Sequence, residues 1–173
     1  MKTITNKTED RVNQLLAVLD KDIQHILESL SRLNELRGLV VKRDDVSLQK
    51  LLGSIKSESN SYKENELKRL SLRKELAIAS NCSLKQMTLS RLEAELSGEK
   101  QAEVAERKTT LQTLAVKLKK EHLSTTMLLA DCARFNSVLL KSVLESVQTG
   151  TVTYTPKGFV KRQTGSAFVN LEF

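Results

Sequence analysis

The sequence has few of the residues that build metal sites, disulfide scaffolds and tight turns. Its 2 cysteines, Cys82 and Cys132, and its 2 histidines, His25 and His122, are too far apart to form a CxxC or an HxxxH pair. We therefore predict no metal site and no cofactor. With 6 glycines, 1 proline and no tryptophan in 173 residues, the composition also argues against an all-β sandwich and against a loop-rich disulfide protein.

Segments that would direct the chain into a membrane are missing as well. Residues 1–11, MKTITNKTEDR, contain no apolar run like that of a secretory signal peptide. The richest apolar window, residues 127–147, is interrupted by charges at regular steps, which predicts that it does not insert into a membrane. These charged residues are Asp131, Arg134, Lys141 and Glu145. We expect a cytoplasmic protein with reduced cysteines.

The motifs of common enzymes and nucleic-acid binders are absent too. There is no glycine-rich phosphate loop, no GxSxG sequence and no paired arrangement of His and Cys, so we predict that the chain is not an enzyme. The net charge is +7, but Lys and Arg are scattered, and only residues 157–162, KGFVKR, combine basic with aromatic side chains. Because phosphate binding needs clustered cations, we predict no nucleic-acid partner.

What the sequence does contain is a helical pattern that is rich in leucine, with 29 leucines. A helix is predicted over residues 9–41, where apolar residues recur every seven positions. This row consists of Val12, Leu19, Ile26, Leu33 and Val40. A turn is predicted at residues 43–45, RDD, because aspartate competes for backbone hydrogen bonds and favours caps.

A second helix is predicted over residues 46–79, with apolar stripes near both of its ends. Between the stripes, residues 57–66, SESNSYKENE, contain a single apolar residue, Tyr62. Two interpretations stay open, because the helix is either solvated in this segment or kinked there.

Two further helices complete the pattern. A short amphipathic helix is predicted over residues 84–97, and Gly98 is placed to end it. The longest helix is predicted over residues 102–148. Its second half is apolar nearly all round, so it must be covered on more than one face, either by the protein's own core or by a partner.

Residues 150–173 differ in character from the rest. They hold 4 of the 6 aromatic residues, and Val152 and Tyr154 alternate with threonine as in a strand. Aromatic residues are frequent anchors at interfaces. The sequence leaves open whether this tail is disordered, docks on a partner or folds back over the protein's own apolar groove.

Together these patterns predict an all-α fold. We expect an elongated antiparallel bundle of three long helices with one short helix over residues 1–149, followed by an extended C-terminal tail over residues 150–173. Heptads pair helices within a chain and between chains equally well, so the sequence leaves open whether the protein is a homo-oligomer.

The order and spacing of these segments resemble the FlgN-type flagellar export chaperones. The likeness is carried by LVVKRDDVSLQKLL, KENELKRLSLRKEL, LKQMTLSRLEAEL, RFNSVLLKSVLESV and a tail that begins TYTPKG. Its most specific pieces are Asn136 with Leu139 and Leu140, and Tyr154 followed four residues later by Gly158.

The resemblance implies a function and a set of partners. Members of this family hold the helical terminal segments of hook-associated junction proteins, prevent their premature assembly and deliver them to the export gate of the flagellar type III apparatus. Applied to this chain, the resemblance places client contacts on the last helix, at Leu128, Phe135, Asn136, Leu139, Leu140, Val143 and Leu144. It places contacts with the export gate in the tail, at Tyr154 and Gly158.

One alternative uses the same helices in a different way. A structural coiled-coil adaptor or assembly factor would bridge partners through its heptads and would have no secretion client. Changes at Phe135 and Leu139 separate the two functions: they abolish client capture in a chaperone and disrupt self-assembly in an adaptor.

Overall fold

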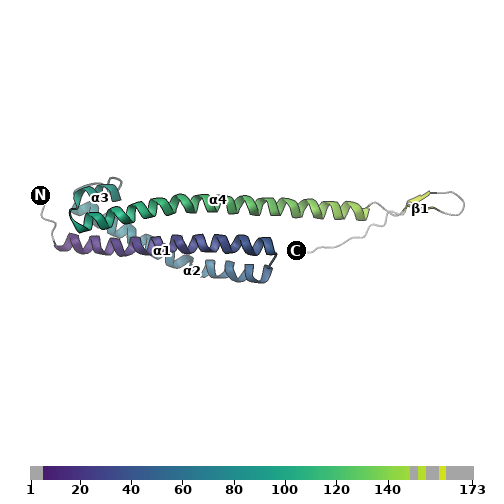
Figure 1. The fold of residues 1–173 in the computed structure, drawn as a ribbon, viewed down its shortest axis with the longest axis horizontal. Helices are drawn as coiled ribbons and strands as arrows, with labels where there is room; N and C mark the ends of the chain where they lie inside the picture. Colours follow the sequence, from purple (N-terminus) through teal and green to yellow (C-terminus); the bar gives the residue numbers. More distant parts are fainter. Residues whose placement is uncertain (1–5, 149–151, 155–159, 163–173) are drawn as a thin grey trace. The chain divides into compact units, whose positions relative to one another are not determined.

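The computed structural model describes residues 6–148, 152–154 and 160–162 (Figure 1). These residues form α1 (Asn6–Lys42), α2 (Asp45–Ala79), α3 (Leu89–Glu95), α4 (Glu99–Gln148), β1 (Val152–Tyr154) and β2 (Val160–Arg162). The chain divides into two compact units, residues 1–125 and 126–173, so α4 contributes to both. The sequence pattern predicted the division between helical bundle and tail further along the chain, at residue 150.

The predicted helical fold class is confirmed, and three of the four helices begin and end within about one turn of their predicted positions. The exception is the short helix. It was expected over residues 84–97 but spans only residues 89–95, because residues 84–86 form a turn and residues 87 and 88 are not helical.

Side chains from outside this turn hold it in place. The guanidinium group of Arg73 in α2 donates hydrogen bonds to the carbonyl oxygens of Leu84 and Met87, at 2.9 and 3.1 Å. Thr88 then caps α3, because its hydroxyl accepts a hydrogen bond from the amide of Arg91. These polar contacts compete with helix formation before residue 89, and the amphipathic spacing of the leucines does not reveal them.

α1 and α2 are joined by a tight turn where the sequence predicted one. Arg43 adopts a positive φ of 56°, and the carboxylate of Asp44 accepts a hydrogen bond from the amide of Ser47 at 3.0 Å. Asp44 therefore satisfies one of the free N–H groups at the start of α2.

Charged side chains link α1 to α2 along their length. Near the start of α1, Arg11 pairs with Glu75 at 2.9 Å, and further along Asp22 pairs with Arg69 at 2.5 Å. The beginning of α1 therefore lies beside the end of α2, and the two helices run in opposite directions.

The polar segment 57–66 is helical throughout and contacts α1. Arg32 of α1 donates a hydrogen bond to the hydroxyl of Tyr62 at 2.7 Å and forms an ion pair with Glu58. The ring of Tyr62 also meets His25 edge-on, with ring centroids 4.4 Å apart. Much of the contact between this segment and α1 is therefore polar, and Tyr62 is its single apolar residue.

One residue of this segment, Asn65, is buried, with 6% of its surface exposed. Its side-chain amide donates hydrogen bonds to the carbonyl oxygen of Val18 at 3.3 Å and to the carboxylate of Asp22 at 2.7 Å. The other oxygen of Asp22 accepts a hydrogen bond from Arg69. Because buried polar groups need partners, a shift of α1 along α2 would break all of these bonds.

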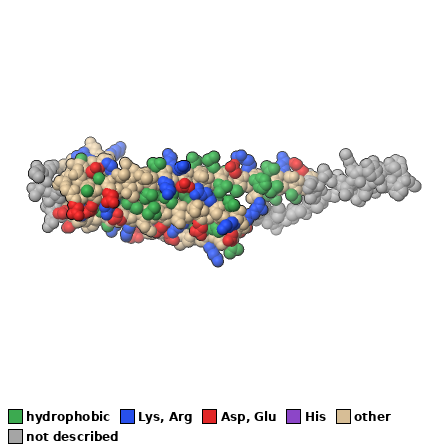
Figure 2. Space-filling model, in the orientation of Figure 1, with side chains coloured by type: hydrophobic (Ala, Val, Ile, Leu, Met, Phe, Trp, Pro, Cys, Tyr) green, Lys and Arg blue, Asp and Glu red, His purple; other side chains and the backbone are tan. Residues whose placement is uncertain are grey.

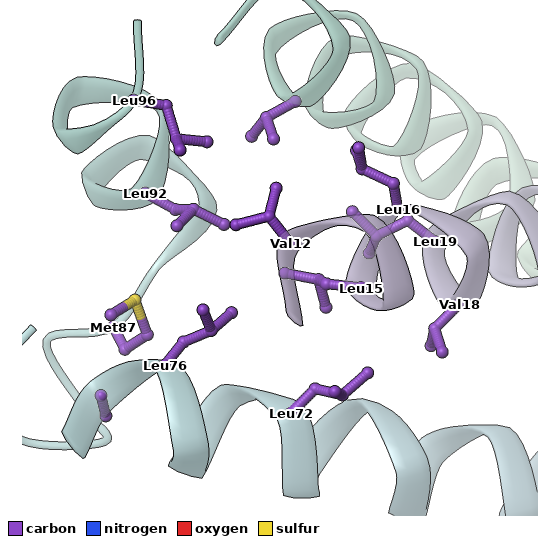
Figure 3. Packing of buried hydrophobic residues seen from close by; sticks show 12 residues of the cluster. Val12, Leu15, Leu16, Val18, Leu19, Leu72, Leu76, Met87, Leu92 and Leu96 are labelled. Atoms are coloured by element: carbon purple, nitrogen blue, oxygen red, sulfur yellow. The ribbon is translucent and has the colours of Figure 1, made fainter. Parts of the chain in front are cut away.

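The hydrophobic core of the first unit lies where α1, α2, α3 and the start of α4 meet (Figure 3). Its buried residues are Val12, Leu15, Leu16, Val18, Leu19, Leu72, Leu76, Ala77, Met87, Leu92, Leu96 and Val104. The heptad row of α1 is only partly in this core, since Ile26, Leu33 and Val40 are half-buried. The core is therefore concentrated near the start of α1 and the end of α2.

Beyond this core, long side chains connect α4 to α1 within the first unit. Arg107 pairs with Asp20 at 2.8 Å, and Glu121 pairs with Arg37 at 2.6 Å. Ion pairs therefore link α4 to α1 at two points of the first unit.

The second unit contains the remainder of α4 and a small hairpin. β1 and β2 pair in antiparallel fashion, with Val152 opposite Arg162, Thr153 opposite Lys161 and Tyr154 opposite Val160. The first strand coincides with the alternating residues that the sequence pattern singled out.

Candidate functional site

The part of α4 that belongs to the second unit carries a row of exposed apolar side chains. Residues 99–148 contain neither glycine nor proline, so the sequence offers no break in this helix. The exposed large hydrophobic residues are Met127, Leu129, Phe135, Val138, Leu139, Leu140, Val143 and Leu144. Figure 2 shows hydrophobic side chains at the surface along α4. Exposed apolar surface of this extent is typical of interaction sites.

Most of these residues lie on one side of the helix, in two rows. The first row, which we call the seam, consists of Leu128, Cys132, Phe135 and Leu139. Its steps of four, three and four residues are those of a coiled-coil stripe. Leu128 and Cys132 are half-buried, whereas Phe135 and Leu139 are exposed.

The second row, which we call the shoulder, consists of Leu129, Ala133, Leu140 and Leu144. With about 100° per residue in an α-helix, the shoulder is centred about 120° from the seam. Asn136 and Val143 lie in the angle between the two rows. Seam and shoulder together form an apolar face that covers about half of the circumference of the helix.

The opposite side of this stretch carries its charges. Asp131 and Arg134 form an ion pair at 3.7 Å, and Lys141 and Glu145 form another at 3.9 Å. By the same helical geometry, Asp131 borders the seam and Lys141 lies beyond the shoulder. The charges are therefore confined to one side of the helix, which also carries the exposed side chains of Met127 and Val138.

The apolar face begins after a polar stretch of α4. The position seven residues before Leu129, the first residue of the shoulder, holds His122, and the position seven residues before Leu128, the first residue of the seam, holds Glu121. Seam and shoulder are therefore apolar together from residue 128 onward.

The structure places all seven residues predicted to bind a client on this part of α4. Phe135, Leu139, Leu140 and Leu144 are exposed members of the seam or the shoulder, and Leu128 is half-buried in the seam. Asn136 and Val143, which lie between the rows, are also exposed.

Sequence reasoning did not include Leu129 among the client contacts, although its spacing to Ala133 and Leu140 marks it as part of the shoulder. Of the two residues predicted to contact the export gate, Tyr154 lies in β1, and Gly158 lies outside the described residues.

A cavity in the first unit was not predicted from the sequence. A cavity of about 540 Å³ lies between α1, α2 and the first part of α4. Its lining is formed by Ile26, Ser29, Arg32, Leu33, Leu36, Ile55, Tyr62, Ala115, Leu118, Lys119 and His122. No local sequence motif predicts this cavity, because the residues that form its wall are far apart in the sequence.

The charged groups on the cavity wall are partly engaged within the protein. Arg32 is bound to Glu58 and Tyr62, and the hydrogen bond to Glu58 raises the pKa of Arg32. Arg32 therefore stays cationic and paired. The remaining wall is mostly aliphatic, so the cavity offers little chemistry beyond apolar contact.

Two kinds of site are not found in the part of the chain that the structure describes. No group of three His, Cys, Asp or Glu side chains is arranged to hold a metal ion there. No described helix is both long enough and apolar enough to span a membrane. Comparisons with known proteins add no further constraint, since no family model, no curated protein and no solved structure matches the chain.

Proposed function

We propose that this protein is a cytoplasmic, non-enzymatic export chaperone of the FlgN type. In this proposal it binds the helical terminal segments of hook-associated junction proteins, prevents their premature assembly and delivers them to the flagellar type III export gate. The observation that carries the proposal is the exposed apolar face of α4, formed by the seam and the shoulder. The resemblance of the sequence segments to that family supplies the identity of the client.

The physical reasoning concerns what an unassembled client exposes. A subunit that polymerises through helical segments carries apolar stripes before it reaches its neighbours, and these stripes aggregate. An exposed apolar face on a long helix can cover such a stripe, in the manner of a helix that packs into a groove. The task needs no cofactor and no reacting group.

The other parts of the chain have distinct roles in this proposal. The first unit is taken as an antiparallel bundle of long helices with the short α3 at one end. This bundle holds the first part of α4 in a folded structure. The tail, through Tyr154 and Gly158, contacts the export apparatus. Binding of the client is expected to depend on α4, and delivery on the tail.

The test mixes the purified full-length protein with terminal helical segments of hook–filament junction proteins at moderate salt. Calorimetry measures the affinity, and light scattering measures the mass of the complex. We expect a complex of defined stoichiometry that Phe135→Asp abolishes and that a chain ending at Gln148 still forms. Because the contact is apolar, added salt should change the affinity little.

The loss at Phe135 has an expected size. A phenylalanine buries about 200 Å², and 56% of Phe135 is exposed, so a partner can cover about 110 Å² of it. At about 25 cal/mol per Å² this is about 2.8 kcal/mol, which makes Phe135→Ala about 100-fold weaker in affinity. Val116→Ala is the matched control, because Val116 is exposed on the first part of α4.

The same experiment tests the adaptor. If no segment binds and the protein instead forms a defined oligomer that Phe135→Asp disrupts, the chaperone proposal is wrong and the face serves self-assembly. Circular dichroism must show the same helix content in the variant and in the wild-type protein, so that unfolding does not account for the loss.

A further inference from the structure

The width of the apolar face on α4 constrains the shape of the partner. A helix that pairs with one other helix needs apolar residues at only two of every seven positions, whereas a helix that faces two neighbours needs three or more. Between residues 128 and 144 the seam fills the first two positions, and the shoulder adds at least one more. One partner helix centred on the seam would leave much of the shoulder in water.

The protein itself contains an apolar face of similar width, and more than one helix covers it. Residues 12–19 of α1 bury Val12, Leu15, Leu16, Val18 and Leu19, which span about 160° of that helix. In Figure 3 these side chains meet Leu72 and Leu76 of α2 on one side and Leu92 of α3 on another. This cluster also includes Val104 of α4.

From this comparison we infer that the partner covers α4 with two helices, one along the seam and one along the shoulder. The inference rests on the proposed function, and it specifies the client as an amphipathic helical pair or hairpin. From residue 128 to residue 144 the face is about 25 Å long. Each partner helix therefore contributes about five turns.

Charges at the edges of the face distinguish the two partner helices. Asp131 borders the seam, so the helix that packs there is expected to carry Lys or Arg along its outer edge. Lys141 lies beyond the shoulder, so the second helix is expected to carry Asp or Glu there. Charge complementarity of this kind mainly fixes register and orientation. Asn136, exposed between the two rows, offers an amide that either helix can use as a hydrogen-bond partner.

The experiment asks which helix of the partner lies at each row. A photoreactive benzoylphenylalanine replaces Phe135 in one variant, Leu140 in a second and Val116 in a control. Each full-length variant is mixed with a terminal junction-protein segment that has two predicted helices, and then with each helix alone as a peptide. Mass spectrometry identifies the cross-linked peptide, and calorimetry measures the affinities.

We expect positions 135 and 140 to cross-link to different helices of the segment, and position 116 to cross-link to neither. Each single helix should bind at least tenfold more weakly than the two-helix segment. If both positions cross-link to one helix, or if one helix binds as tightly as the pair, the two-helix inference is overturned while the chaperone function stands. If no segment binds at all, or if only copies of this chain cross-link, both are overturned.

Discussion

Replacing Asn65 tests whether a buried polar network holds α1 and α2 together. The change to make is Asn65→Leu, which keeps a side chain of similar size and removes both hydrogen bonds. The carboxylate of Asp22, only 13% exposed, then loses its contact with the amide of Asn65 at 2.7 Å and keeps Arg69. The carbonyl oxygen of Val18 also loses a donor.

The expected cost follows from the charge on the acceptor. A hydrogen bond to a charged group contributes about 1.5–3 kcal/mol, so we expect Asn65→Leu to lower the free energy of unfolding by about 2 kcal/mol. This is about a 30-fold change in the ratio of folded to unfolded protein. Asn60→Leu is the control, because Asn60 lies in the same segment and is exposed. Its effect should stay within about 0.5 kcal/mol.

Urea unfolding followed by circular dichroism measures both variants, and a double variant completes the cycle. Adding Asp22→Leu to Asn65→Leu removes both partners and leaves Arg69, which is 39% exposed, able to reach water. The double variant should therefore lose less than the sum of the two single losses, by about 1–2 kcal/mol. Wild-type stability in Asn65→Leu would refute the reasoning, since the contact would then be one of shape alone.

Three further predictions concern the core, a cap and a turn. Leu76→Ala should lower the free energy of unfolding by about 3 kcal/mol, because the side chain of Leu76 is only 1% exposed. Leu140→Ala, at an exposed position, should change the free energy of unfolding by less than about 0.5 kcal/mol. Thermal and urea unfolding measure both variants. The hydrogen bond from the backbone of Ser47 lowers the pKa of Asp44, so the stabilisation lost in Asp44→Ala should be present above about pH 3.9 and should disappear as the pH falls through the lowered pKa. Gly98 has a φ of +65° with open space around it, so Gly98→Ala should cost about 1 kcal/mol in urea unfolding through backbone strain rather than through a clash.

The helices could be predicted from the sequence because their signals are local. Apolar spacing locates α1, α2 and α4, and the RDD sequence locates the turn between the first two. The segment 57–66 is helical in the structure, and Arg32 and Asp22 of α1 supply partners for it. The spacing within α2 alone does not reveal those partners, because they lie on another helix.

The candidate site was predictable in part for a similar reason. Periodicity on α4 placed Phe135, Leu139 and Leu140 on a wide apolar face. Periodicity alone does not tell a buried face from an exposed one, because both have the same pattern. The exposure of this face and the cavity in the first unit depend on where other helices lie, and so they follow only from the tertiary structure.

The concentration of the core near one end of the first unit has a consequence for local opening. Backbone amides around Leu15 and Leu72 lie within the buried cluster, so their hydrogens should exchange with solvent only when the whole unit unfolds. Amides near Val40 and Leu48, close to the turn between α1 and α2, are held by half-buried side chains and by the cap at Asp44. Their hydrogens should exchange far sooner, through openings that leave the core intact. We therefore expect the local stability of the α1–α2 hairpin to decrease from the end that contacts α3 toward the turn.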